Sequence, residues 1–291
     1  MEFLAQMING LSLGSIYALI ALGYTMVYGI CKMLNFAHGD VIMVGAYMLS
    51  VAMGMLGLPP VLAILLSMVV CACLGVTIER IAYKPLRNAS PLAVLITAIG
   101  VSYFLQSSAL LIFGSTQRKV ESAINVSSVQ LGELTIGGNA LVTLLLTIVL
   151  MTGLTWFINH TMTGKAMLAV SEDKGAAQLM GVNVNRTIAT TFLIGSALAA
   201  VAGVLFISSY GFVGPYTGAM PGIKAFVAAV LGGIGSVPGA MLGGILLGLI
   251  ESLSKAYIST QLADAIVFGV LIVVLLVKPT GLLGKKRTEK V

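Results

Sequence analysis

Residues 169–188, AVSEDKGAAQLMGVNVNRTI, form the longest polar, charge-bearing interruption of a strongly apolar chain. They lie between two hydrophobic runs, at 140–158 and 187–210. A helix short enough to fit in this segment is marginal by itself, so it needs contacts to hold it. The segment therefore predicts a membrane-embedded chain that presents a docking element to a soluble partner.

The composition assigns the chain to the polytopic membrane proteins. Of its 291 residues, 58% are hydrophobic and only 9% are charged, and the mean hydropathy is +1.04. Several apolar runs reach the roughly 20 residues that cross about 30 Å of hydrocarbon. Backbone polar groups in lipid must bond within their own segment, so we expect these runs to be helices. We predict an all-α polytopic membrane protein with one transmembrane domain over residues 1–291.

We expect eight or nine transmembrane segments, including a glycine-rich broken-helix hairpin. The separate spans are predicted at 7–30, 41–58, 61–83, 91–113, 140–158, 187–210 and 262–277. The hairpin is predicted at 223–234 and 239–254. The start of the chain lacks a basic n-region, so we expect the first run to be a span and not a cleavable signal peptide.

The orientation follows from the basic residues, which gather at the ends of the expected spans. Lys and Arg are enriched in cytoplasmic loops, and the tail at 278–290 is strongly basic. Counting back from a cytoplasmic C-terminus places Met1 outside and the loop at about 160–186 inside. Four basic residues then remain on the outer side: Arg118, Lys119, Lys224 and Lys255. Basic residues scattered over span ends do not form a nucleic-acid surface, so we expect no nucleic-acid partner.

The other long loop, at about 114–139, is then extracytoplasmic. Residues 126–136, VSSVQLGELTI, alternate enough to allow a small β-hairpin there.

The turn between the first two expected spans is rich in polar groups. Asn35 and Asp40 are expected to cap helix ends with their side chains, and Gly39 allows a tight bend. Polar groups near membrane depth usually serve a pathway or a partner. One interpretation therefore puts Asn35, His38, Gly39 and Asp40 on a substrate path, and the other is a capped cytoplasmic turn.

Glycines dominate the stretch 211–248. Their four-residue spacing is typical of tight helix crossings in lipid, and it occurs at Gly235, Gly239 and Gly243 and again at Gly244 and Gly248. Discontinuous helices of this kind often flank the pathway of a transporter. Gly232, Gly233 and Gly235 are therefore further candidates for the substrate path, with packing alone as the alternative. Glu251 and Lys255, four residues apart, predict a local ion pair.

The polar segment itself predicts one to two turns of helix. Glu172, Asp173 and Lys174 open it, with the acidic groups near the positive end of the helix dipole. A small apolar face and a stop are expected to follow, at Ala176, Ala177, Met180 and Gly181. Gly181 stands where a helix end favours a left-handed residue.

Three stretches together resemble the permeases of branched-chain amino acid ABC transporters, and most closely their LivH-type half. They are NFAHGD at 35–40, SEDKGAAQLMGVNVNRT at 171–187 and AVLGGIGSVPGAMLGG at 229–244. The resemblance runs from the first span to the C-terminus. It is less specific for the substrate, because related members carry urea, short amides or other amino acids.

The resemblance implies a pore-forming subunit of an importer in a bacterial inner membrane. It implies a second homologous permease chain, two cytoplasmic ATP-binding subunits and a periplasmic binding protein that delivers leucine, isoleucine or valine. The loop that couples the permease to its ATPase would contain Ser171, Glu172, Asp173, Ala176, Ala177, Gly181 and Arg186. The sequence has no G-x-x-x-x-G-K-[ST] motif, so we expect ATP and magnesium to bind the partner subunits and no cofactor to bind this chain.

Two other classes compete with this interpretation. An ion-coupled carrier or channel usually buries ionisable groups in mid-span, whereas Asp40, Glu79, Glu251 and Asp264 fall near the ends of the expected spans. A membrane enzyme needs a catalytic constellation such as H-E-x-x-H or G-x-S-x-G, and the sequence contains neither. His38 and His160 are far apart in sequence, so no metal site is expected.

Overall fold

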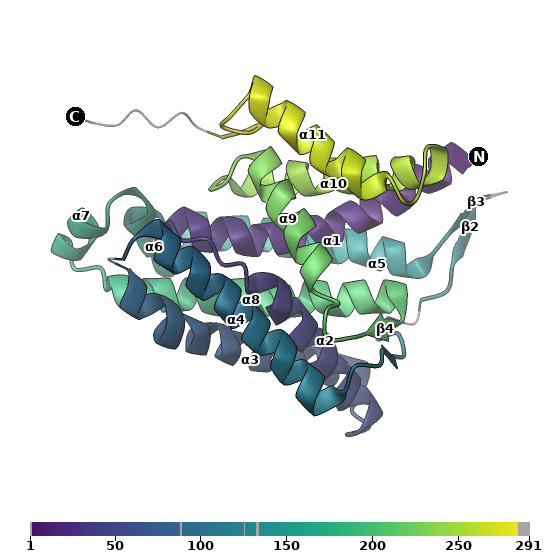
Figure 1. Cartoon of the computed structure of the whole chain (residues 1–291), viewed down its shortest axis with the longest axis horizontal. Coiled ribbons are helices and arrows are strands. Elements are labelled where there is room, and N and C mark those ends of the chain that lie inside the picture. The colour runs from purple at the N-terminus through teal and green to yellow at the C-terminus, as the bar shows by residue number, and fades with distance from the viewer. Residues whose placement is uncertain (1, 88, 125, 132–133, 285–291) are drawn as a thin grey trace.

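The chain folds into a bundle of helices that run side by side (Figure 1). A computed structural model describes residues 2–87, 89–124, 126–131 and 134–284. The long helices are α1 (Glu2–Cys31), α3 (Pro60–Ile78), α4 (Pro91–Phe113), α5 (Gly138–His160), α8 (Val184–Tyr210) and α10 (Val237–Tyr257). The shorter ones are α2 (His38–Gly54), α6 (Met162–Glu172), α7 (Lys174–Leu179), α9 (Ala219–Gly232) and α11 (Ala263–Val277).

Strands are few and lie at one end of the bundle. The predicted hairpin is confirmed, because β2 (Val129–Leu131) pairs antiparallel with β3 (Leu134–Ile136). A second antiparallel pair joins β1 (Arg118–Lys119) to β4 (Phe212–Val213) and so ties the loop after α4 to the end of α8. α7 lies at the opposite end, which we call the α7 end (Figure 1).

Six helices of the described residues are long and apolar enough to cross a membrane. They are Phe3–Cys31, Pro60–Leu86, Pro91–Phe113, Gly138–His160, Val184–Tyr210 and Val237–Tyr257. The predicted count of eight or nine is therefore not confirmed. Three of the expected segments form helices of only 17, 14 and 15 residues, namely α2, α9 and α11.

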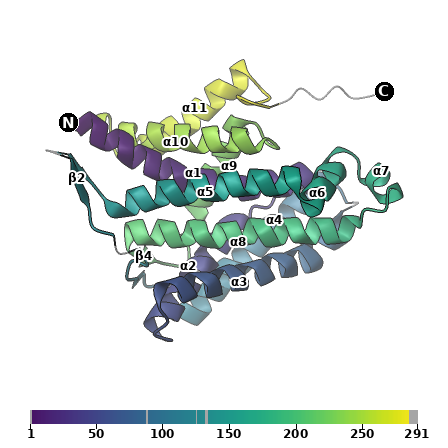
Figure 2. The same ribbon diagram turned by 180° about the vertical axis from the view of Figure 1, so that it is seen from behind.

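α1 is the central helix of the bundle. In an apolar 18-residue window of α1, 83% of the helix is buried. The same share is 17% for α4 and 22% for α5. α8 is also largely enclosed and runs beside α5 (Figure 2). The exposed apolar faces of α3, α4 and α5 suit lipid or another apolar chain.

α10 packs through two glycine edges. Gly239 and Gly243 approach the backbone of α9, and Gly244 and Gly248 approach the backbone of α1. A Cβ at any of these four positions would overlap backbone atoms of the facing helix. The predicted small-residue crossings are therefore confirmed at these four positions but not at Gly235, where a Cβ would meet no atom within 4 Å, and the predicted broken-helix hairpin is not confirmed.

Buried ions join the same helices near the end opposite α7. The predicted Glu251–Lys255 pair is present at 2.6 Å, but Glu251 is buried and Lys224 of α9 also contacts it at 2.8 Å. Lys224 further contacts Asp264 of α11 at 2.6 Å, and the Tyr17 hydroxyl of α1 donates to Glu251 at 2.9 Å. Lys224, which we counted among the basic residues of the outer side, is only 6% exposed and is held by these ion pairs.

α2 starts inside the bundle and not at its surface. The ring of His38 lies against Gly23, which is eight residues before the end of α1. Because a helix rises about 1.5 Å per residue, the start of α2 lies about 12 Å from that end of α1. Gly39 packs against the start of α9, where Gly218 and Gly222 leave no room for a side chain. Gly39 thus serves this close approach and not the bend that we expected, and Asp40 is buried deeper than the span end at which we expected it.

The α10–α1 crossing can be tested with matched substitutions. Gly248→Ala places a methyl group into the backbone of Gly14, so we expect the free energy of unfolding to fall by about 2 kcal/mol. Gly269→Ala on α11 meets no atom within 4 Å and should be neutral or slightly stabilising, because Ala favours helix over Gly. Thermal unfolding of the detergent-purified variants compares the two. Equal midpoints would contradict the packing role.

Candidate coupling site and substrate path

The polar segment at 171–186 forms the short helix predicted for it. Asp173 caps α7, because its Oδ1 accepts a hydrogen bond from the Ala176 N–H at 2.9 Å. Gly181 has φ +86° and ends the turn in a conformation that L side chains rarely adopt. Asn183 then caps α8, accepting from the N–H of Arg186 at 3.0 Å.

The start of this segment differs from the prediction. Residues 162–172 form helix α6, so Glu172 is the last residue of that helix and not in the first turn of α7. Ser171 lies in the same last turn, with its hydroxyl donating to the Leu168 carbonyl at 2.7 Å. The loop that we expected at about 160–186 therefore contains a second helix that was not predicted, whose start is marked by Thr161 as N-cap.

The predicted apolar face of α7 is divided between the interior of the chain and its surface. Ala177 is buried, but Ala176 is exposed. Leu179 and Met180 are 90% and 84% exposed, so two large apolar side chains stand clear of the rest of the chain. Apolar groups displayed on a polar, projecting element are typical of a protein contact.

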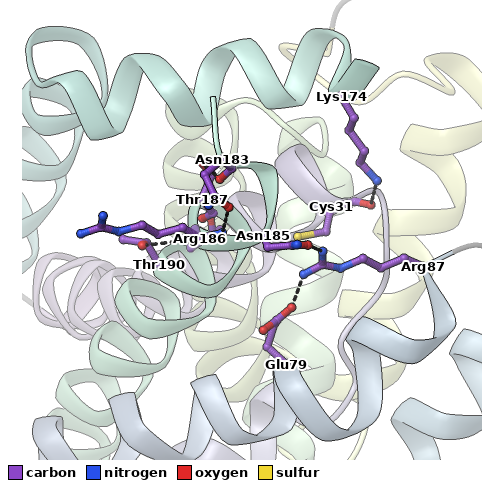
Figure 3. Close-up of polar contacts among 10 residues, drawn as sticks. Cys31, Glu79, Arg87, Lys174, Asn183, Asn185, Arg186, Thr187 and Thr190 are labelled. Carbon is purple, nitrogen blue, oxygen red and sulfur yellow. Dashed lines mark hydrogen bonds and ion pairs between the residues drawn. The ribbon is translucent and has the colours of Figure 1, made fainter. Parts of the chain in front are cut away.

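A basic cavity of about 730 Å³ lies between α7 and the ends of α3 and α8. Its lining includes Lys84, Arg87, Lys174, Gln178, Asn183 and Asn185. Figure 3 shows Arg87 bonded to the buried Glu79 on one side and to Asn185 on the other. The ammonium group of Lys174 donates to the Cys31 carbonyl at 3.1 Å. These contacts connect the polar segment to the ends of α1, α3 and α8.

Sequence reasoning missed this ionic connection. The available signal was Glu79, an acidic residue in the apolar run 61–83, with Arg87 eight residues later. The backbone between them forms a π-helical turn (Glu79–Tyr83) and a 3₁₀ turn (Lys84–Leu86), which the sequence did not indicate. Rare helical turns of this kind set the direction of side chains and cannot be placed from apolar periodicity.

The polar groups at 35–40 bond to other helices instead of capping α2. The N-cap of α2 is Ala37, which makes no side-chain cap bond, so the predicted caps were wrong. The Asn35 side-chain oxygen accepts from the Tyr83 hydroxyl at 2.9 Å. Asp40 Oδ1 accepts from the Gln106 amide of α4, also at 2.9 Å, and the sequence gave no sign of this partner.

The other three candidate path residues lie in the turn between α9 and α10. Gly232 packs against Gly239, whereas Gly233 and Gly235 have φ values of +105° and +97°. The segment after α11 covers this turn, since the Leu283 N–H donates to the Gly232 carbonyl at 2.9 Å.

A small apolar pocket brings the two groups of path residues near one another. It is lined by Tyr24, Tyr28, Leu34, Asn35, Phe226, Ala229 and Ile234. Asn35 is the one predicted path residue in the lining, and Ile234 is the neighbour of both Gly233 and Gly235. His38 lies next to it, edge-on to Tyr24 with ring centroids 4.8 Å apart.

A multi-pass helical chain with a projecting, capped helix and buried polar turns has the features of a transport permease. Residues 6–276 match the family model described as branched-chain amino acid transport system / permease component. The chain belongs to this family.

Two relatives are similar over nearly their whole length. The branched-chain amino acid permease protein LivH of Salmonella typhimurium is 48% identical, with 99% of this chain and 98% of LivH covered. The corresponding protein BraD of Pseudomonas aeruginosa is 46% identical, with 100% and 98% covered. PsaBC from Streptococcus pneumoniae, solved in complex with Fab, shares the fold with a TM-score of 0.50 at 13% identity, covering 94% of this chain and 91% of that chain.

The ionic connection at the α7 end makes a stability prediction. Arg87→Met leaves the buried carboxylate of Glu79 without its cation, so we expect the free energy of unfolding to fall by about 3 kcal/mol. Adding Glu79→Gln should recover most of this loss, because the uncompensated charge is then removed. Arg80→Met, at an exposed neighbouring position, is the matched control and should change little. A double variant as unstable as Arg87→Met in thermal unfolding would contradict the pairing.

Proposed function

We propose that this chain is the pore-forming permease subunit of an ABC importer for leucine, isoleucine and valine in a bacterial inner membrane. The observation that carries the proposal is the 46–48% identity, over nearly the full length, to relatives named as high-affinity branched-chain amino acid permeases. ATP hydrolysis takes place on separate subunits, where ATP and magnesium bind, and this chain carries no cofactor.

The partners that complete the importer are a second, homologous permease chain, two cytoplasmic ATP-binding subunits and a periplasmic binding protein. Within the residues that the structure describes, the six long helices together with α2, α9 and α11 belong to one transmembrane domain. The α7 end faces the cytoplasm, and the loop at about 114–139 faces the periplasm together with the N-terminus. The excess of Lys and Arg at the α7 end supports this orientation.

The residues at 171–186 couple this chain to an ATP-binding subunit. Exposed Leu179 and Met180 give α7 an apolar tip for a protein cleft, and Gly181 sets the direction of the following turn. Movement of α7 passes to α1 through Lys174, and to α3 and α8 through the contacts of Arg87. Alternating access follows when the ATP-binding subunits close and separate.

The substrate path includes Asn35, His38, Gly39 and Asp40, and the turn at Gly232, Gly233 and Gly235. The aromatic pocket beside Asn35 supplies apolar surface for a branched aliphatic side chain. Tight selection by the membrane site is unnecessary, because the binding protein selects the substrate first.

The coupling role can be tested at Gly181. Gly181→Val puts a β-branched residue at φ +86°, so we expect the turn to shift and leucine uptake to fall at least tenfold while the subunit still reaches the membrane. Gly57→Val is the matched control, because Gly57 also has positive φ and open surroundings but lies in the loop between α2 and α3. Uptake equal to wild type in cells carrying Gly181→Val would rule out the coupling assignment.

The orientation can be tested by thiol labelling after Cys31, Cys71 and Cys73 have been replaced. Thr116→Cys lies at an exposed position in the loop after α4, and Gln178→Cys at an exposed position of α7. We expect an impermeant maleimide to label the first variant in cells with a permeable outer membrane and an intact inner membrane. The second should react only after the inner membrane is opened. The reverse pattern would invert the proposed orientation.

A further inference from the structure

Asp40 differs from the other buried charged residues of this chain. Among the residues that the structure describes, four Asp, Glu, Lys or Arg side chains are buried: Asp40, Glu79, Lys224 and Glu251. The last three have oppositely charged partners, since Glu79 pairs with Arg87 and Lys224 with Glu251. Asp40 has no cationic partner among the described residues.

Neutral groups surround the Asp40 carboxylate. The Gln106 amide donates to it at 2.9 Å and also donates to the Ser102 hydroxyl at 3.3 Å. Both residues are on α4, the long helix with the smallest buried share. Asp40 is 2% exposed, so the seam between α2 and α4 is closed around it.

The position of Asp40 makes an unpaired carboxylate costly. It lies in the first turn of α2, which starts about 12 Å inside the bundle. The positive end of a helix dipole offsets only part of the cost of burying an ion. An Asn would keep the hydrogen-bonded contact to Gln106 without this cost. The charge therefore points to a cation that joins Asp40 when the seam opens.

We infer that Asp40, oriented by Gln106, binds the ammonium group of the amino-acid substrate during its passage through the permease. This inference rests on the proposed function, which supplies a substrate with a positively charged amine. The carboxylate meets the ammonium group when α4 separates from the start of α2. Departure of the substrate closes the seam to the arrangement observed here.

Asp40→Asn tests this inference, because it removes the charge while keeping the size and a hydrogen bond to Gln106. The assay uses the complete importer, with its partner permease, ATP-binding subunits and binding protein, in proteoliposomes supplied with radiolabelled leucine. We expect uptake to fall at least tenfold, with the thermal midpoint of the complex and ATP hydrolysis in the absence of substrate unchanged. The double variant Asp40→Asn/Gln106→Glu returns a carboxylate to the same seam and should recover part of the uptake.

The other outcomes would overturn either the role of Asp40 or the proposed function. Uptake within twofold of wild type in Asp40→Asn, or no recovery in the double variant, would mean that Asp40 only joins α2 to α4. Loss of uptake together with a lower thermal midpoint would mean the same. A wild-type complex that fails to import leucine would overturn the proposed function itself.

Discussion

The close approach of α10 to α1 and α9 is the constraint on which the rest of this structure depends. In lipid, burying apolar side chains gives helices little reason to associate, so van der Waals contact and polar bonds must hold them together. The glycines of α10 allow that contact on two sides, because Gly244 and Gly248 pack against the backbone of α1 while Gly239 and Gly243 pack against the backbone of α9. α1 is thereby enclosed, and α9 is held where its start meets the start of α2.

Charged groups then tie the bundle near its two ends. Towards the end opposite α7, Glu251 and Lys224 join α1, α9, α10 and α11 in a buried network. At the α7 end, Arg87 and Lys174 join the polar segment to three long helices. α1 belongs to both sets of contacts, so a displacement of α7 acts on a helix whose other end is held by the buried network. This arrangement suits a subunit that receives mechanical work at one end and changes shape in the middle.

The sequence allowed much of this architecture to be predicted, because apolar run length and glycine spacing act locally. The helix at 91–113 and the small-residue crossings of α10 were both read from such patterns. The depth of the turn at 35–40 was not predicted, because it depends on how far the chain runs back along α1 before α2 starts. Apolar runs reveal no such return, and the helix at 162–172 was hidden by its mixed composition.

The candidate site was predicted less completely than the fold. The cap at Asp173 and the left-handed Gly181 follow from local chemistry. The partners Gln106 and Asn185 lie 66 and 98 residues from Asp40 and Arg87, and no short-range pattern links them. Long-range polar pairs are decided by tertiary packing, so the structure was needed to find them.

Reconstitution of uphill transport tests most directly the claim that this chain is a conduit driven by a separate ATPase. The chain would be placed in liposomes either alone or with its partner permease, ATP-binding subunits and binding protein, and leucine accumulation would be followed with and without ATP. The account predicts accumulation against a gradient only for the complete assembly with ATP. Accumulation by the chain alone, driven by an ion gradient, would contradict it.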